Sequence, residues 1–214
     1  MKITLLCSDE RHPVNGHLQS WIGAQEGIHE VELIRSQAQL SGGDILFLIS
    51  CSQIIGEEER RAYRKVLVLH ASDLPQGRGW SPHIWQIIAG AEEITVSLLE
   101  AEDPVDSGAI WKTVRISIPK HALWDEINAR LFDAEIELID FAVREFERIS
   151  PIPQDTTIAP TYYPQRIPTD SRVDPYGSIS SQFDRIRVCD PNRFPAFFEL
   201  HGKKFKLVLE KFDE

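Results

Sequence analysis

Short apolar runs separated by polar segments rich in Pro and Gly divide the first half of the chain. Continuous apolar runs of this length are typical of parallel strands that are buried on both faces of a sheet. The runs predict strands at residues 3–7, 31–34, 44–49, 66–69 and 94–99, and the alternating residues 109–118 predict a sixth. Helical spacing predicts helices after Asn15-Gly16, over residues 57–63, and from Ser81-Pro82 to residue 90. Ser81 is a favoured N-cap residue there, and Pro82 a favoured residue of the first turn.

One long amphipathic helix is predicted over residues 121–149. Its apolar positions recur at three-, four- or seven-residue intervals, and most other positions are charged, which indicates core packing rather than a cofactor site. The repeated strand–turn–helix pattern predicts an α/β fold with a doubly wound, mostly parallel, Rossmann-like sheet. No G-x-G-x-x-G sequence follows the first strand, so the dinucleotide-binding fingerprint is absent.

The composition changes after residue 150, where Pro, Thr, Tyr and Gln become frequent. We therefore expect two parts, a main domain over residues 1–150 and a C-terminal extension over residues 151–214. The extension is predicted to contain a helix at residues 179–188 and a small β-hairpin, whose strands at 196–200 and 205–209 flank a Gly-containing turn.

The charge of the chain argues against a nucleic-acid partner. The sequence has 23 basic and 33 acidic residues, for a net charge of −10, whereas nucleic-acid binding normally needs a basic surface. The three cysteines, Cys7, Cys51 and Cys189, have no spacing that suggests a disulfide framework or a metal site. The N-terminus reads as a first strand rather than a signal peptide, and we expect a cytoplasmic protein.

A candidate site begins where the strand at 66–69 ends. His70 stands there, and a Pro- and Gly-rich turn follows through residue 82. Open α/β sheets place their chemistry at such strand ends. Considered alone, His70 could be a structural histidine, and Asp106 could cap the Ser107-Gly108 turn.

Two motifs resemble the signature of the folate-dependent formyltransferases. Residues 68–82, with His70, Ser72, Leu74-Pro75 and Gly79, resemble the family's N-x-H-x-S-x-L-P-x-x-x-G core, and Asp106-Ser107-Gly108 resembles its second motif. Residues 162–171 and 187–198 look like the tail of the nucleotide-sugar N-formyltransferases, most like those of the pseudaminic-acid-pathway type. The resemblance implies that residues 1–150 are the catalytic domain. It also implies that the longer, RNA-binding C-terminal domain of the tRNA enzymes is absent.

The resemblance implies transfer of a formyl group from N10-formyltetrahydrofolate to the primary amine of a nucleotide-linked amino sugar, possibly a UDP-linked 4-amino sugar, by a homodimer. His70 is then the proton acceptor or oxyanion partner, and Asp106 its orienting carboxylate. The implied cofactor-binding residues are Ser50, Cys51, Ser52, Glu100, Ala101, Glu102 and Asp103. The implied substrate-binding residues are His12, Ser72, Arg78, Gly79, Trp80, Tyr163 and Arg166. No metal ligand is implied.

One position departs from the family pattern. Val68 stands where the family has an Asn, two residues before the His, that donates a hydrogen bond to the formyl oxygen. Loss of one such donor costs about 3 kcal/mol in the transition state. Asn15, His12, Ser72 or protonated His70 could supply the donor instead. Two other functions remain open, hydrolysis of the formyl donor and non-catalytic binding of folate or nucleotide. Methionyl-tRNA is the least favoured candidate for the formyl acceptor.

Overall fold

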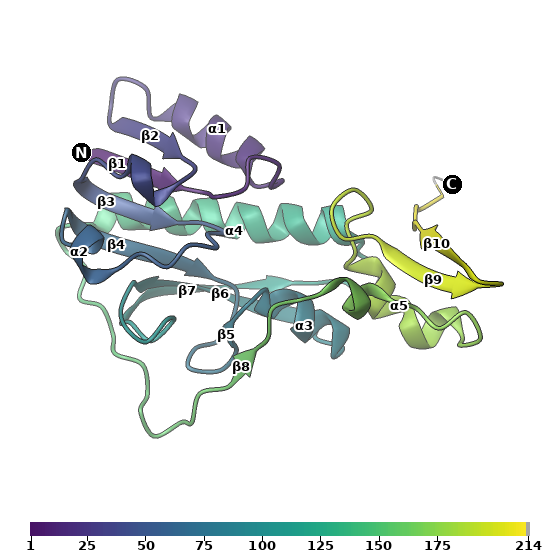
Figure 1. The fold of residues 1–214 in the computed structure, drawn as a ribbon. Coiled ribbons are helices and arrows are strands. Elements are labelled where there is room, and N and C mark those ends of the chain that lie inside the picture. Colours follow the sequence, from purple (N-terminus) through teal and green to yellow (C-terminus); the bar gives the residue numbers. More distant parts are fainter. Residues whose placement is uncertain (213–214) are drawn as a thin grey trace.

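Six strands form the central sheet of the computed structural model, which describes residues 1–212 (Figure 1). In spatial order they are β2 (Glu30–Ile34), β1 (Lys2–Leu6), β3 (Gly43–Leu48), β4 (Tyr63–His70), β6 (Glu93–Glu100) and β7 (Ile110–Ser117). The first four run parallel, whereas β6 is antiparallel to both β4 and β7. His70 therefore ends the last strand of the parallel half, next to the antiparallel pair.

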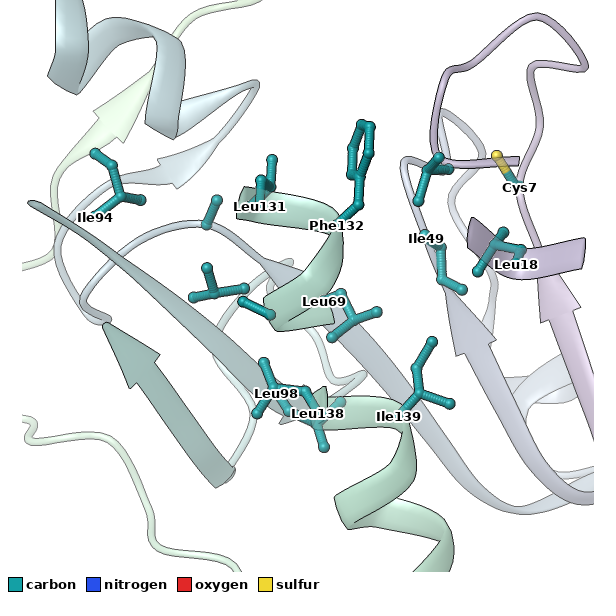
Figure 2. Packing of buried hydrophobic residues seen from close by; sticks show 14 of the residues in the cluster. Cys7, Leu18, Ile49, Leu69, Ile94, Leu98, Leu131, Phe132, Leu138 and Ile139 are labelled. Carbon is teal, nitrogen blue, oxygen red and sulfur yellow. The ribbon is translucent and has the colours of Figure 1, made fainter. Parts of the chain in front are cut away.

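Helices α1 (Asn15–Ala24) and α4 (Trp124–Glu145) pack on one face of the sheet (Figures 1 and 2). The apolar stripe of α4 supplies Leu131, Phe132, Leu138 and Ile139, all buried against β3, β4 and β6 residues in the larger core cluster. A smaller apolar cluster covers the other face near the short α2 (Glu57–Arg60). Burial of these stripes fixes the register of the sheet and with it the position of His70.

The chain after α4 crosses the sheet edge and returns to the site before it forms the C-terminal arm (Figure 1). On the way, β8 (Tyr162–Tyr163) pairs in parallel with β5 (Arg78–Gly79) in the turn after His70. The remaining elements are α3 (Pro82–Ile88), α5 (Ile179–Arg187), the 3₁₀ helices η1 (Gln37–Gln39) and η2 (Pro168–Ser171), and the hairpin strands β9 (Ala196–Leu200) and β10 (Lys203–Leu207).

The predicted α/β fold, with its mostly parallel sheet and C-terminal β-hairpin, is confirmed. Several local predictions differ. The second hairpin strand, predicted at residues 205–209, spans Lys203–Leu207, because the turn takes only His201 and Gly202. The helix predicted over residues 57–63 ends at Arg60, because Tyr63 already belongs to β4. Ser81 precedes α3 as predicted, but its backbone is left-handed and its hydroxyl makes no capping bond. Among residues 1–212, no helix is both long and apolar enough to cross a bilayer.

Candidate active site

His70 lies where buried β4 opens into the polar turn. Its imidazole is 7% exposed, its Nε2 lies 2.8 Å from the carbonyl oxygen of Gly77, and its Nδ1 lies 3.7 Å from Oδ1 of Asp106. A carbonyl oxygen only accepts hydrogen bonds, so Nε2 carries a hydrogen in this arrangement. When Nδ1 is protonated too, the imidazolium lies between two acceptors that stabilise its charge.

Asp106 reaches His70 from the loop between β6 and β7. Its backbone is left-handed, with a φ of 59°, and its buried carboxylate accepts the backbone N–H of Gly79 at 2.9 Å. Two residues on, a Cβ at Gly108 would collide with the carbonyl oxygen of Glu100. The Asp-Ser-Gly motif thus joins a carboxylate aimed at His70 to a glycine that lets the loop pass against β6.

The turn that contains Gly77, Arg78 and Gly79 is held by the chain that crosses back over it. Gly79 has a φ of 96°, and a Cβ there would lie 2.5 Å from the carbonyl oxygen of Tyr163. The backbone N–H groups of Arg78 and Trp80 donate to the carbonyls of Thr161 and Tyr163 at 2.9 and 3.1 Å. Only glycine permits this close approach, which explains its place in the motif.

The side chains predicted to contact the acceptor differ in solvent exposure and in the hydrogen bonds that they already make. Trp80 is 42% exposed, whereas Arg78 is buried and its Nη2 donates to Oε1 of Gln154 at 2.7 Å. Tyr163 is half-buried beside Gly77. Arg166 donates to the hydroxyl of Ser171 at 2.9 Å. Trp80 is therefore the most accessible of the four, whereas Arg78 already uses Nη2 on Gln154 and keeps a buried Nε without a partner among the described residues.

Ser72 contributes an unused hydroxyl close to His70. Its Oγ is enclosed and has no hydrogen-bond partner among the residues that the structure describes, and it lies 3.4 Å from the place of a Cβ on Gly77. Its backbone carbonyl, in contrast, accepts the Ser97 hydroxyl at 2.7 Å. A buried hydroxyl without a partner is costly, so this group is a candidate hydrogen-bond donor to a bound molecule.

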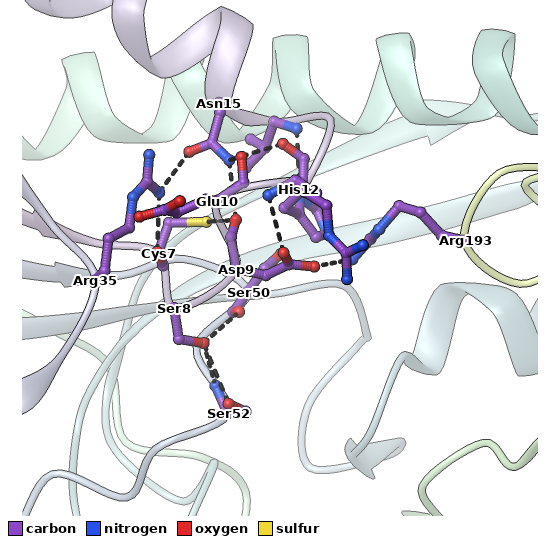
Figure 3. A network of polar contacts seen from close by, with 12 residues as sticks. Cys7, Ser8, Asp9, Glu10, His12, Asn15, Arg35, Ser50, Ser52 and Arg193 are labelled. Carbon is purple, nitrogen blue, oxygen red and sulfur yellow. Dashed lines mark hydrogen bonds and ion pairs between the residues drawn. The ribbon is translucent and has the colours of Figure 1, made fainter.

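The loop after β1 is tied down by a polar network (Figure 3). The side-chain amide of Asn15 donates to the carbonyls of Asp9, Glu10 and His12, and its Oδ1 accepts from Arg35 at 2.7 Å. Asp9 forms a 2.6 Å ion pair with Arg193, which comes from the C-terminal arm. Because its donors and acceptor are all occupied, Asn15 is poorly placed to replace the missing donor at Val68.

Two histidines near the site are kept neutral. Burial lowers the pKa of His12 to about 4, and the positive charge of Arg193 contributes. Burial lowers the pKa of His83 in α3 to about 3, with further contributions from His12 and His70. Nδ1 of His83 is enclosed without a partner within the described chain. Both imidazoles therefore act as neutral hydrogen-bonding groups near neutral pH, not as cations.

The two loops predicted to hold the folate meet through one arginine. Arg60 in α2 donates to the carbonyl of Ile55 at 2.8 Å and forms a 2.6 Å ion pair with Asp103. Ser50 and Ser52 both contact the Ser8 hydroxyl. Glu100 pairs with Lys65 at 2.5 Å and lies opposite Leu67 on β4, three residues before His70. Ala101 donates its N–H to the Val66 carbonyl, and Glu102 is exposed.

Sequence reasoning gave no role to His83, Arg193 or Gln154, which the structure brings to this region. His83 follows Pro82 at the start of α3, so its place directly after the motif was a usable signal. Gln154 lies outside the motifs and Arg193 lies in the tail segment 187–198, and both reach the site only because the chain returns after α4. Within residues 1–212, no group of three or more His, Cys, Asp or Glu residues is arranged to hold a metal ion.

The site geometry agrees with the comparisons with known proteins. Residues 10–143 match the sequence profile of the formyl transferase family, which is more than half of the chain. The chain belongs to this family. The predicted relationship to the folate-dependent formyltransferases is confirmed, and both signature motifs lie within or beside the matched region.

Curated relatives and solved structures extend this result. A methionyl-tRNA formyltransferase from Synechococcus sp. (strain JA-3-3Ab) is 30% identical over 142 residues, which are 65% of this chain and 43% of that protein. The chain thus spans about half the length of the curated relatives it matches.

The solved structures are more distant in sequence and show the fold. A methionyl-tRNA formyltransferase from Clostridium thermocellum has a TM-score of 0.81 at 20% identity and covers 98% of both chains. A sugar N-formyltransferase from Shewanella sp. FDAARGOS_354 has a TM-score of 0.72 at 14% identity, with 100% and 99% coverage. HypX from Aquifex aeolicus, solved with tetrahydrofolic acid, has a TM-score of 0.78 at 22% identity and covers 95% of this chain and 36% of that one.

Proposed function

We propose that this chain transfers a formyl group from N10-formyltetrahydrofolate to the primary amine of a nucleotide-linked amino sugar. The observation that carries the formyl transfer is the buried His70–Asp106 pair at the end of β4, in a chain of the formyl transferase family. The pair supplies a base and a charge-stabilising carboxylate at one point, next to an unused hydroxyl.

The residues present can perform each proton movement of the reaction. The acceptor amine must be neutral, because an ammonium group has no lone pair. As its nitrogen bonds to the formyl carbon and the bond from that carbon to N10 breaks, the proton lost by the amine passes to the ring nitrogen of neutral His70 that carries no hydrogen, which is Nδ1 in this arrangement, and His70 can return a proton to N10. Asp106 and the Gly77 carbonyl stabilise the imidazolium in between.

Negative charge develops on the formyl oxygen and needs a hydrogen-bond donor. Val68 has none. Ser72 is the best replacement, because its hydroxyl is enclosed near Gly77 and has no partner in the described chain. The Nε2–H of His70 is a second donor once it leaves the Gly77 carbonyl.

We assign the folate donor to the side of the site formed by the loops that Arg60 joins. Ser50, Cys51 and Ser52 offer main-chain and hydroxyl groups there, and residues 100–103 lie across from them. When bound, N10-formyltetrahydrofolate supplies the formyl group. Together with the unpartnered Ser72 hydroxyl, these groups can orient a formyl carrier toward His70.

A small nucleotide-linked acceptor suits the opposite side of the site. Trp80 presents an exposed aromatic surface for a base, and we assign His12, Tyr163, Arg166 and the backbone of Arg78 and Gly79 to contacts with the rest of the acceptor. The net charge of −10 disfavours a polyanion such as tRNA. The chain overlays along almost its whole length both with the Shewanella sugar N-formyltransferase and with the Clostridium thermocellum methionyl-tRNA formyltransferase, so these overlays reflect the shared fold and the choice of acceptor rests on the charge and on Trp80.

Methionyl-tRNA is the second candidate acceptor, and the names of the curated relatives favour it. A charged tRNA would have to bind beside 33 acidic residues with only 23 basic ones to contact its phosphates. Any such binding should weaken steeply with salt.

The partner that we propose is a second copy of the chain, bound through the C-terminal hairpin. The rings of Phe198 and Phe205 stack at 5.4 Å, and Phe205 is 44% exposed on the outer strand of this two-stranded sheet. The stacked pair forms a small aromatic surface flanked by the lysines of β10, and we assign it to contact with the second copy.

The test is an acceptor panel with the purified chain and N10-formyltetrahydrofolate. Nucleotide-linked amino sugars and methionyl-tRNA are compared at matched concentrations, with a no-acceptor control, and products are identified by mass spectrometry. One added formyl group on an amino sugar supports the proposal. Transfer to methionyl-tRNA alone selects the second candidate, and folate release at the same rate without any acceptor indicates hydrolysis.

A further inference from the structure

Gln154 is the only residue of the returning chain, within the described part, whose side chain contacts the backbone of Asp106. Its Nε2 donates to the carbonyl oxygens of Asp106 and Gly108 at 2.8 and 3.0 Å. Its Oε1 accepts from Nη2 of Arg78 at 2.7 Å. A guanidinium only donates and a carbonyl only accepts, so these partners leave a single orientation for the amide.

These contacts close a ring around the proposed base. His70 contacts the Gly77 carbonyl through Nε2, and Gly77 is bonded to Arg78. Arg78 contacts Gln154, Gln154 contacts the Asp106 backbone, and the Asp106 carboxylate returns to His70. Movement at any member of the ring therefore changes the distance between Asp106 and His70.

The backbone of Asp106 needs such support. Its φ of 59° lies in the left-handed region, which residues other than Gly adopt at a cost. The two carbonyl groups that Gln154 binds lie on either side of Ser107, and so fix the loop at the residue that carries the carboxylate.

We propose that Gln154 is a positioning residue for the formyl transfer: it holds the Asp106 carboxylate at His70 and couples it to the Gly77–Gly79 turn. This inference rests on the proposed function for its kinetic consequence. Gln154 lies half-buried, and it acts through Asp106 and not on either substrate.

Gln154→Glu is the sharpest variant. Glutamate keeps the acceptor for Arg78 as an ion pair, which favours folding, but it replaces the donor that faces two carbonyl oxygens with a second acceptor. Gln76→Ala is the matched control, because Gln76 also joins the turn to the returning chain, at the carbonyl of Ala159 (2.7 Å), without contact to Asp106.

Steady-state kinetics of wild type, Gln154→Glu and Gln76→Ala give the first readout. We expect kcat of Gln154→Glu to fall by about 10- to 100-fold, as small displacements of catalytic groups do, with KM for donor and acceptor within about twofold and Gln76→Ala close to wild type. Equal effects of the two variants, or a kcat of Gln154→Glu within about twofold of wild type, would overturn the proposal.

A double-mutant cycle separates positioning from general destabilisation. In an Asp106→Asn background, Gln154→Glu should lower the remaining rate by less than about threefold, because residues that act as one unit are not additive. A full additive loss would show that Gln154 acts elsewhere.

An NMR experiment keeps the inference independent of the proposed reaction. The ring ¹⁵N shifts of His70 report the hydrogen bonds at each nitrogen and should change in Gln154→Glu, while those of His201 in the exposed hairpin turn should not. Unchanged His70 shifts would overturn the positioning role even if transfer is observed. Changed shifts without transfer to any acceptor would support it and contradict only the proposed function.

Discussion

The loop after β6 and the middle of α4 each bury one carboxyl group, and the two groups have different surroundings. Asp106 is 6% exposed and accepts the N–H of Gly79 at 2.9 Å, with His70 at 3.7 Å. Glu135 is 5% exposed, and its Oε2 has no hydrogen-bond partner among the residues described. Burial raises the pKa of Glu135 to about 8.

The comparison shows that partners, rather than burial, decide what a buried carboxyl group does. Hydrogen bonds and a nearby imidazole stabilise the ionised form of a carboxylate, whereas burial alone favours its neutral form. Asp106 is therefore suited to stabilise a cation at His70. Glu135, which lies on the Cys7 side of the core, holds a proton at neutral pH, and the free energy of unfolding falls as the pH rises toward its pKa.

The largest expected effect is the loss of kcat when Asp106, the carboxylate with hydrogen-bond partners, is replaced. Asp106→Asn should lower kcat by about 10³-fold, because the amide cannot stabilise the imidazolium, while its oxygen can still accept from Gly79. Steady-state kinetics and urea denaturation of the same samples check this. A kcat within tenfold of wild type in a folded variant would contradict the role of Asp106.

Glu135→Gln should affect stability instead of catalysis. Between about pH 4.5 and pH 8 the unfolded chain ionises Glu135 while the folded chain keeps its proton, so the folded state binds more protons and the free energy of unfolding falls as pH rises. Glu135→Gln lacks this pH-dependent loss. The difference in free energy of unfolding, variant minus wild type, should therefore be larger at pH 8 than at pH 5 by roughly 2–4 kcal/mol.

Urea denaturation of Glu135→Gln and wild type at the two pH values measures this difference, with kcat expected to stay within about twofold. Asp140→Asn, at an exposed position of the same helix, is the control for an acid-to-amide change outside the core. Equal stability differences at pH 5 and pH 8 would show that Glu135 is ionised in the folded protein.

A donor placed at position 68 tests the site from the other direction. Val68 and His70 lie two residues apart on β4, so their side chains share one face of the sheet. Ser72→Ala should lower kcat by about 10-fold or more, and Val68→Asn in that background should restore most of the loss by supplying the missing donor. Val68→Ala is the control without a donor. A kcat of Ser72→Ala within about twofold of wild type would exclude Ser72 as the oxyanion donor.

The smallest effect is expected at Asp9, a more exposed carboxylate paired with Arg193. The backbone N–H of Arg11 and the Arg193 side chain lower the pKa of Asp9 below its usual value, so this pair stabilises the fold near neutral pH and the contribution is lost as pH falls through the lowered pKa. Asp9→Asn should cost about 0.5–1 kcal/mol at pH 7, as for other solvent-exposed pairs. Thermal denaturation at pH 7 and pH 3 checks the value and its loss in acid.

The fold could be predicted from the sequence because its signals are local. The apolar runs that became β1, β3 and β4, and the stripe that became α4, record burial directly in residue order. The antiparallel direction of β6 could not be read from its apolar run, because burial on both faces gives the same pattern in either direction.

The site was predictable only where motifs carried it. His70 and Asp106 came from two short motifs, and the structure brings them together. The contacts of Gln154 and Arg193 depend on how residues 151–212 return across the sheet, and no local pattern encodes that path. The hydrogen bonds of Arg78 with Gln154 and of Asn15 with Arg35 likewise depend on residues that are distant in the sequence.

One measurement tests the central claim most directly: a single-turnover assay with ¹³C-formyl-labelled donor and an amino-sugar acceptor, in which wild type and His70→Ala are compared by mass spectrometry. We predict that wild type transfers the labelled formyl group to the acceptor amine and that His70→Ala, folded and still able to bind folate, does not do so on the same time scale. Transfer by His70→Ala at near the wild-type rate would contradict the account.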